Sequence, residues 1–215
     1  LARSDANHPW FRTVLRASGH SVSWELLALA LKTEDDSMAQ WRRDCVRSVS
    51  RDQESASQAI DAILEHPGDH DALALAHASV DALVSQTGNP PSPSLQSKLQ
   101  TVWEHATSAS ARVEPTPESI ATFLRWLPNR ASVHRLGALL SEGPTQAIRQ
   151  AAGDSLVALG NVDALSALFR NLEAFDESTV SRWPAQCCIR PAGRRAVMDA
   201  IDQGWLAPTQ LMPEE

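Results

Sequence analysis

Apolar residues recur along most of the chain at every third or fourth position, which is the spacing of one face of an α-helix. Trp41, Cys45 and Val49 show this pattern at intervals of four. Similar spacing runs through the stretches 23–31, 55–64, 73–84 and 95–106. Strands would instead need alternating β-branched and aromatic residues, and the chain has no tyrosine and no such run. The pattern predicts an all-α protein.

Residues that typically begin and end helices lie between these stretches. Thr116 followed by Pro117 predicts an N-cap and the first residue of a helix. Pro67 and Gly68 predict the end of one helix, and Asp69 is the expected N-cap of the next. Because these signals agree with the apolar periodicity, they strengthen the all-α prediction.

The second half of the chain contains an internal repeat. When the sequence is offset by 32 residues, apolar positions coincide: Ile120 with Ala152, Leu124 with Leu156, Leu136 with Leu168 and Leu140 with Leu172. A further 32 residues gives a weaker copy, in which Leu156 falls on Cys188 and Leu165 on Val197. Each copy would be a helix, a tight break and a second helix. One such hairpin cannot bury its apolar face alone, so neighbouring hairpins are expected to stack.

The repeat is clearest over residues 144–174. This segment combines an aliphatic-Arg pair, a pair of small residues, an Ala-Leu-Gly turn and a second helix that begins with Asp-Ala-Leu. In order, these features are Ile148-Arg149, Ala151-Ala152, Ala158-Leu159-Gly160 and Asp163-Ala164-Leu165. In these features it resembles the HEAT-like (armadillo-type) family of helical repeats. The resemblance implies an α-α superhelix, a HEAT-like solenoid of antiparallel helix pairs.

The residues of this segment have readable local roles. Gly160 can adopt the left-handed conformation that ends a helix, and Asn161 or Asp163 can cap the next one. Arg149 is expected to lie along a groove or to pair with a neighbouring acid. Proline-rich breaks predict three regions along the chain: an irregular helical region at 1–112, a HEAT-like region at 113–207 and a disordered tail at 208–215.

Charge and hydropathy exclude some partners. The net charge is -7 and the acidic excess is concentrated in residues 52–124, which carry ten acidic and two basic side chains. Nucleic acid is therefore an unexpected partner, since proteins that bind polyanions usually carry a positive field. No apolar segment approaches the roughly 18 residues that a membrane helix needs, so no membrane association is expected. The first residue is Leu1, which indicates a trimmed chain or a fragment of a larger protein.

The three cysteines, Cys45, Cys187 and Cys188, are odd in number and contain no CxxC pair. They are typical of buried thiols in a reducing compartment, and we expect a cytoplasmic protein. A redox role for the adjacent pair Cys187-Cys188 is the less favoured alternative.

Candidate catalytic and metal-binding chemistry is sparse. The imidazoles of His66, His70 and His77 are weak candidates for zinc ligands, but they lack the HExxH spacing and Pro67-Gly68 interrupts them. No phosphate-binding glycine loop and no paired nucleophile and base can be recognised in the sequence. We therefore expect no resident metal and no cofactor.

These observations favour a non-catalytic docking module that binds another protein or a peptide. The expected partner-binding residues are Arg135, Arg170 and Glu173 on the second helices of the hairpins, with Trp183 near a helix end. The alternative is an enzyme on the same scaffold. HEAT-like proteins include DNA glycosylases and chromophore lyases, and a glycosylase cleft would use Trp126 with Arg125 and Arg130.

Overall fold

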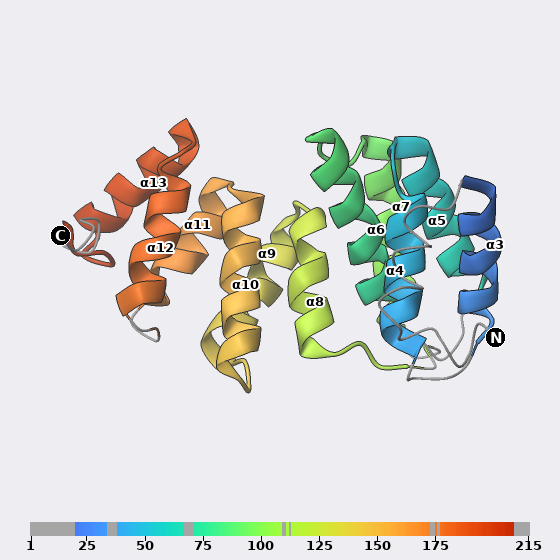
Figure 1. The fold of residues 1–215 in the computed structure, drawn as a ribbon. Helices are drawn as coiled ribbons and strands as arrows, with labels where there is room; N and C mark the ends of the chain where they lie inside the picture. Colours follow the sequence, from blue (N-terminus) through green and yellow to red (C-terminus); the bar gives the residue numbers. More distant parts are fainter. Residues whose placement is uncertain are drawn as a thin grey trace. The chain divides into compact units, whose positions relative to one another are not determined.

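The described part of the chain consists of helices joined by turns and loops (Figure 1). The computed structural model describes residues 20–33, 38–66, 71–108, 111, 113–172, 175 and 177–208. These residues contain no strand, so the all-α prediction is confirmed. Within these ranges, no helix is both long and apolar enough to cross a membrane.

The helices fall into two compact units, Leu1–Ser119 and Ile120–Glu215, and the division lies within helix α8. The first unit contains α3 (His20–Leu31), α4 (Ala39–Val49), α5 (Gln53–Glu65), α6 (Ala72–Thr87) and α7 (Pro93–Ala106). Apart from Pro208, the predicted tail lies outside the described residues.

Helix pairs build the first unit. Helix α3 packs against α4, and α5 packs against α6. The pairs are joined by contacts between helices two positions apart in the chain, α4 with α6 and α5 with α7. Ile60 and Ile63 on α5 and Leu99 on α7 are buried by this packing.

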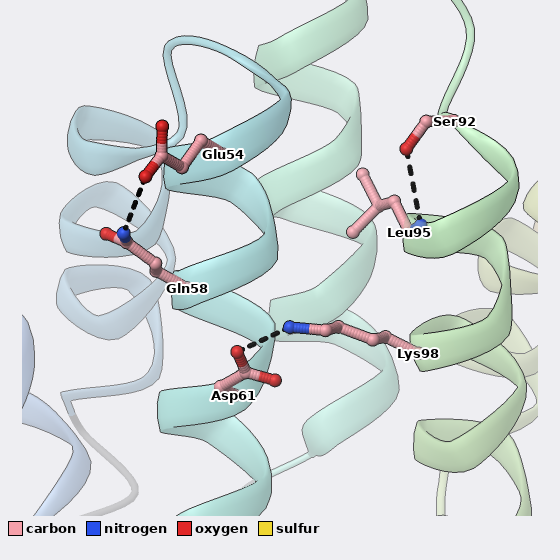
Figure 2. A network of polar contacts seen from close by, with 6 residues as sticks. All are labelled: Glu54, Gln58, Asp61, Ser92, Leu95 and Lys98. Atoms are coloured by element: carbon pink, nitrogen blue, oxygen red, sulfur yellow. Dashed lines mark hydrogen bonds and ion pairs between the residues drawn. The ribbon is translucent and has the colours of Figure 1, made fainter.

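Polar contacts hold the outer side of α5 and α7 together. The ammonium of Lys98 on α7 donates to the carboxylate of Asp61 on α5 (Figure 2). On α5, Glu54 accepts a hydrogen bond from Gln58 one turn later, at 3.5 Å. Because Asp61 and Lys98 are partly exposed, this ion pair is worth little beyond fixing the two side chains.

The second unit contains α8 (Pro117–Phe123) with the 3₁₀ helix η2 (Leu124–Trp126), α9 (Arg130–Glu142), α10 (Gln146–Leu159), α11 (Val162–Phe169), α12 (Glu177–Cys187) and α13 (Pro191–Asp202). From η2 onward each helix packs against the next one along the chain, except α11 and α12, for which no extensive contact is found. Helices two positions apart also pack: η2 with α10, α9 with α11, α10 with α12 and α11 with α13. The segments that the 32-residue offset equates are therefore neighbours in space.

The third copy of the repeat is shifted from the sequence alignment. The offset places Cys188 at the position of Leu156, which is buried inside α10. In the structure α12 ends at Cys187, and Cys187 rather than Cys188 is buried. Val197, aligned with Leu165, is buried as expected. The offset therefore matches Val197 on α13 but fails near the end of α12, because α12 ends four residues before the position 191 that the offset predicts from the end of α10.

Side-chain oxygens cap most helix starts. The hydroxyl of Thr116 accepts a hydrogen bond from the amide of Ser119, and Asn161 accepts one from the amide of Ala164. These two predicted caps are confirmed, and Gly160 has the expected left-handed conformation, with φ of 62°. Asp69 lies outside the described residues, and the cap of α6 is Asp71.

Two arginines each donate a hydrogen bond to a carbonyl at the end of the preceding helix in the chain. Arg149 donates from Nη1 to the carbonyl of Gly143, the residue after α9, at 3.0 Å. The buried Arg42 donates from Nη2 to the carbonyl of Thr33, just beyond α3, at 2.9 Å. Each arginine is the fourth residue of its helix. Arg149 was expected to lie along a groove or to pair with a neighbouring acid, and among the described residues the partner found for it is a helix-end carbonyl.

A close contact in the second unit joins α10 to α12. Trp183 is fully buried, with its indole ring against Gly153, and its Nε1 donates to Asp154 Oδ1 at 2.7 Å. Arg182 donates to the same carboxylate oxygen. The ring of Phe175 meets the Trp183 ring edge-on, with the ring centres 4.9 Å apart. A glycine is required here because any side chain at position 153 would occupy the space of the indole.

Replacing Gly153 by alanine tests this contact. A Cβ atom at 153 would lie 2.9 Å from Trp183 Cε2 and closer still to two other ring atoms. We expect Gly153→Ala to lower the free energy of unfolding by about 1–3 kcal/mol through overpacking. Gly137→Ala on α9 is the matched control, because its Cβ would meet Ala167 Cβ at 3.8 Å. The control should be neutral or stabilise by up to about 1 kcal/mol. Urea denaturation followed by circular dichroism measures both, and equal effects would contradict the prediction.

Candidate functional site

The exposed side of α11 carries a row of side chains at intervals of four residues. Val162, Ser166 and Arg170 occupy one stripe of the helix, and Val162 is 56% exposed. The guanidinium of Arg170 lies over the indole ring of Trp205, 4.7 Å from the ring centre. This cation–π contact joins the end of α11 to the segment that follows α13.

A second row lies on the exposed side of α13, which packs against α11. Arg194, Met198 and Ile201 follow one another at helical spacing; Met198 is 58% exposed, whereas Ile201 is half-buried. Trp205 is half-buried, and its amide donates to the carbonyl of Ala200 at 2.8 Å, so the indole is held beside the helix end.

We name the combined surface the α11–α13 strip. It consists of the two rows and the tryptophan, that is, Val162, Ser166, Arg170, Arg194, Met198, Ile201 and Trp205. Its apolar side chains are Val162 on α11 and Met198 and Ile201 on α13, and Ser166 lies between Val162 and Arg170. Arg170 follows the last residue of α11, whereas Arg194 lies in the first turn of α13. Because Arg170 meets the segment after α13, the two arginines lie toward opposite ends of the strip.

Of the four residues expected to contact a partner, only Arg170 lies in the strip. Trp183 is fully buried and packs inside the unit, which leaves it no surface for a partner. Glu173 lies outside the described residues. Arg135 is exposed on α9 but is two residues from Gly137, which faces Ala167 of α11. Side chains two apart on a helix point about 200° apart, so Arg135 lies on the flank turned away from α11.

The residues considered for a glycosylase-like cleft lie on η2 and at the start of α9. The guanidinium of Arg125 stacks over the ring of its neighbour Trp126, 5.1 Å from the ring centre. Both side chains are half-buried, and Arg130 is exposed as the first residue of α9. The Arg125 guanidinium therefore covers one face of the indole on which a base would have to stack.

The histidine candidates are not assembled into a metal site within the described residues. His66 bonds from Nδ1 to the carbonyl of Ala62, 3.0 Å away on its own helix. His77 is half-buried on α6, and His70 lies outside the described residues. In the described part of the chain, no three histidine, cysteine, aspartate or glutamate side chains are grouped so that they could hold a metal ion.

All three cysteines are free thiols. Burial and, to a smaller extent, the charge of Asp44 together raise the pKa of Cys45 from its ordinary value of 9.0 to about 12. Burial and the neighbouring Cys188 raise the pKa of Cys187 to about 11, although Arg190 opposes the shift. The nucleophile is the thiolate, so neither buried cysteine is primed for nucleophilic or redox chemistry near pH 7.

Comparisons with protein-family models, with curated proteins and with solved structures find no match for this chain. The chemistry of the strip therefore has to be inferred from its own side chains. Sequence periodicity missed the exposure of Val162 and Met198, since apolar residues at helical spacing are normally buried. Their exposure could have been predicted from the sequence, because they share helical rows with the charged residues Arg170 and Arg194.

The raised pKa of Cys45 predicts a loss of stability at alkaline pH. Above pH 9 the unfolded chain releases the thiol proton while the folded protein keeps it, so stability is complete below pH 9 and declines as pH rises toward 12. Between pH 8 and 10.5 we expect wild type to lose about 2 kcal/mol more than Cys45→Ala does. Urea denaturation at both pH values measures this difference. Tyrosine, which also titrates at about pH 10, adds nothing to this pH dependence because the chain has none. Equal pH dependence in the two proteins would contradict the assignment.

Proposed function

We propose that this chain is a non-catalytic docking module that binds a peptide segment of another protein, and that the α11–α13 strip is its docking surface. We further propose that its hairpins form a HEAT-like α-α superhelix. The fold part of the proposal is supported by the contacts of the second unit, where helices two positions apart pack against each other. Stacked hairpins of this kind leave rows of parallel helices exposed as extended binding surfaces.

The exposure of apolar side chains on two adjoining helices carries the functional part. Single exposed apolar residues are common on protein surfaces, but clustered ones often mark interaction sites. Val162 and Met198 are both more than half exposed, and α11 and α13 pack directly against each other. The Arg170–Trp205 pair adds two residue types that are enriched at binding hot spots.

The strip suits binding better than catalysis. Its side chains supply apolar surface, two guanidinium groups and one hydroxyl, and none of them is a general base at neutral pH. Arginine and an indole instead provide orientation and contact area for a partner. The three free thiols fit a reducing compartment, and we propose a cytoplasmic location on that ground.

A phage-displayed library of random 12-residue peptides, selected against the whole protein, tests the proposal. We expect enriched peptides to bind wild type and to bind Met198→Asp at least 10-fold more weakly, because a carboxylate then replaces the most exposed large apolar side chain of the strip. Leu29→Asp is the matched control, since Leu29 is an exposed apolar residue (49%) on α3 of the first unit. Fluorescence anisotropy gives the dissociation constants.

The control should bind the enriched peptides within 2-fold of wild type, and circular dichroism should show both variants folded. Failure to enrich any peptide, or binding that is indifferent to Met198→Asp, would count against the strip as a docking surface.

A further inference from the structure

The turn between α12 and α13 concentrates positive charge next to an exposed apolar side chain. Ile189 is 77% exposed, the highest value among the large apolar residues of the described chain. Arg190, Arg194 and Arg195 follow it within six residues, and all three are exposed. We refer to these four residues as the basic turn.

In the part of the chain that the structure describes, no ion pair joins an acid to Arg190, Arg194 or Arg195. Residues 177–202 contain four arginines and three acids, Glu177, Asp199 and Asp202. Arg182, the fourth arginine, forms an ion pair with Asp154 on α10. Asp199 is four residues beyond Arg195, yet the two do not form a salt bridge. The basic turn therefore groups three exposed guanidinium charges, although the whole chain has a net charge of -7.

Contacts to the backbone hold part of the basic turn in place. Arg194 donates from Nη1 to the carbonyl of Cys188 at 3.3 Å, which fixes its guanidinium beside the turn. Gly193 packs so closely on the Cys187 carbonyl group that a side chain there could not fit, so the turn has a tight, defined backbone. Guanidinium groups held in this way lose less side-chain entropy when they bind a carboxylate.

The basic turn is continuous with the strip. Arg194 belongs to both surfaces. Arg190 Nη1 would lie 2.9 Å from a Cβ atom at Gly160, so the turn between α12 and α13 lies beside the turn between α10 and α11. Val162 lies at one end of the strip and follows Gly160 by two residues in the sequence. A segment lying along the strip would therefore reach the basic turn.

We propose that the docked segment is an acidic peptide: its apolar side chains lie on the α11–α13 strip and its aspartate or glutamate side chains pair with Arg190, Arg194 and Arg195. This inference rests on the proposed function and specifies the class of partner. Arginine binds carboxylates through two parallel hydrogen bonds, which gives both attraction and orientation. Charge complementarity also raises the association rate and makes it sensitive to salt.

Three fluorescein-labelled 12-residue probes test the inference by anisotropy. They consist of four repeats of Leu-Glu-Glu, of Leu-Gln-Gln and of Ser-Glu-Glu, so charge and apolar contact are varied separately. We expect the Leu-Glu-Glu probe to bind at least 10-fold more tightly than either of the others at 50 mM NaCl. Raising the salt to 300 mM should weaken its binding severalfold and leave the Leu-Gln-Gln probe unchanged.

Charge reversal locates the contact. The double variant Arg190→Glu/Arg195→Glu should bind the Leu-Glu-Glu probe at least 10-fold more weakly than wild type. The control Arg130→Glu/Arg135→Glu removes the same charge from exposed positions on α9 and should stay within 2-fold. Arg190→Gln/Arg195→Gln provides a milder second variant, and circular dichroism checks that all three are folded.

The outcomes separate this inference from the proposed function. If library peptides bind through Met198 while the Leu-Glu-Glu and Leu-Gln-Gln probes bind equally, or both charge reversals weaken binding alike, the docking surface stands and the acidic partner is wrong. If no library peptide binds, the proposed function fails. A labelled 20-base-pair DNA duplex is the competing ligand. Tighter binding of the duplex than of the Leu-Glu-Glu probe, lost in Arg190→Glu/Arg195→Glu, would assign the turn to nucleic acid and overturn the inference.

Discussion

The second unit depends on the inability of a single helical hairpin to bury its own apolar face. Each of its helices is covered partly by a neighbour in the chain and partly by the helix two positions away. Leu156 on α10 and Leu168 on α11 are fully buried because contacts of both kinds are made. Any hairpin removed from the middle of such a stack would leave two apolar faces uncovered, so the hairpins stabilise one another.

The regular part of this arrangement was predictable from sequence. Helical periodicity, the caps at Thr116 and Asn161 and the left-handed Gly160 are local features, determined by residues within one or two turns. The 32-residue offset also predicted which segments are neighbours. The offset failed at Cys188 because α12 ends at Cys187, four residues before the end that the offset predicts from α10, and a fixed offset cannot represent a shorter helix.

The contacts that sequence reasoning missed are those between helices. Trp183 lies beside Arg182 near the end of α12, a position typical of a surface aromatic, yet Gly153 on α10 provides the space that buries it. The same limit applies to the candidate site. Arg170 could be proposed from its place on a second helix, but the exposure of Met198 depends on which residues of neighbouring helices fail to cover it. Arg135 was grouped with Arg170 because both were expected on second helices. In the structure Gly137 faces α11, so Arg135 lies on the opposite side of α9.

The hydrogen bonds of Arg42 and Arg149 both run from a helix back to the end of the helix before it. Each is the fourth residue of a helix and donates to a carbonyl at the end of the helix before it, once in each unit. During synthesis from the N-terminus, α3 and α9 gain these partners only after the first turn of the following helix has left the ribosome. In the nascent chain, the end of each of these two helices would then gain its hydrogen bond once the first turn of the following helix has emerged.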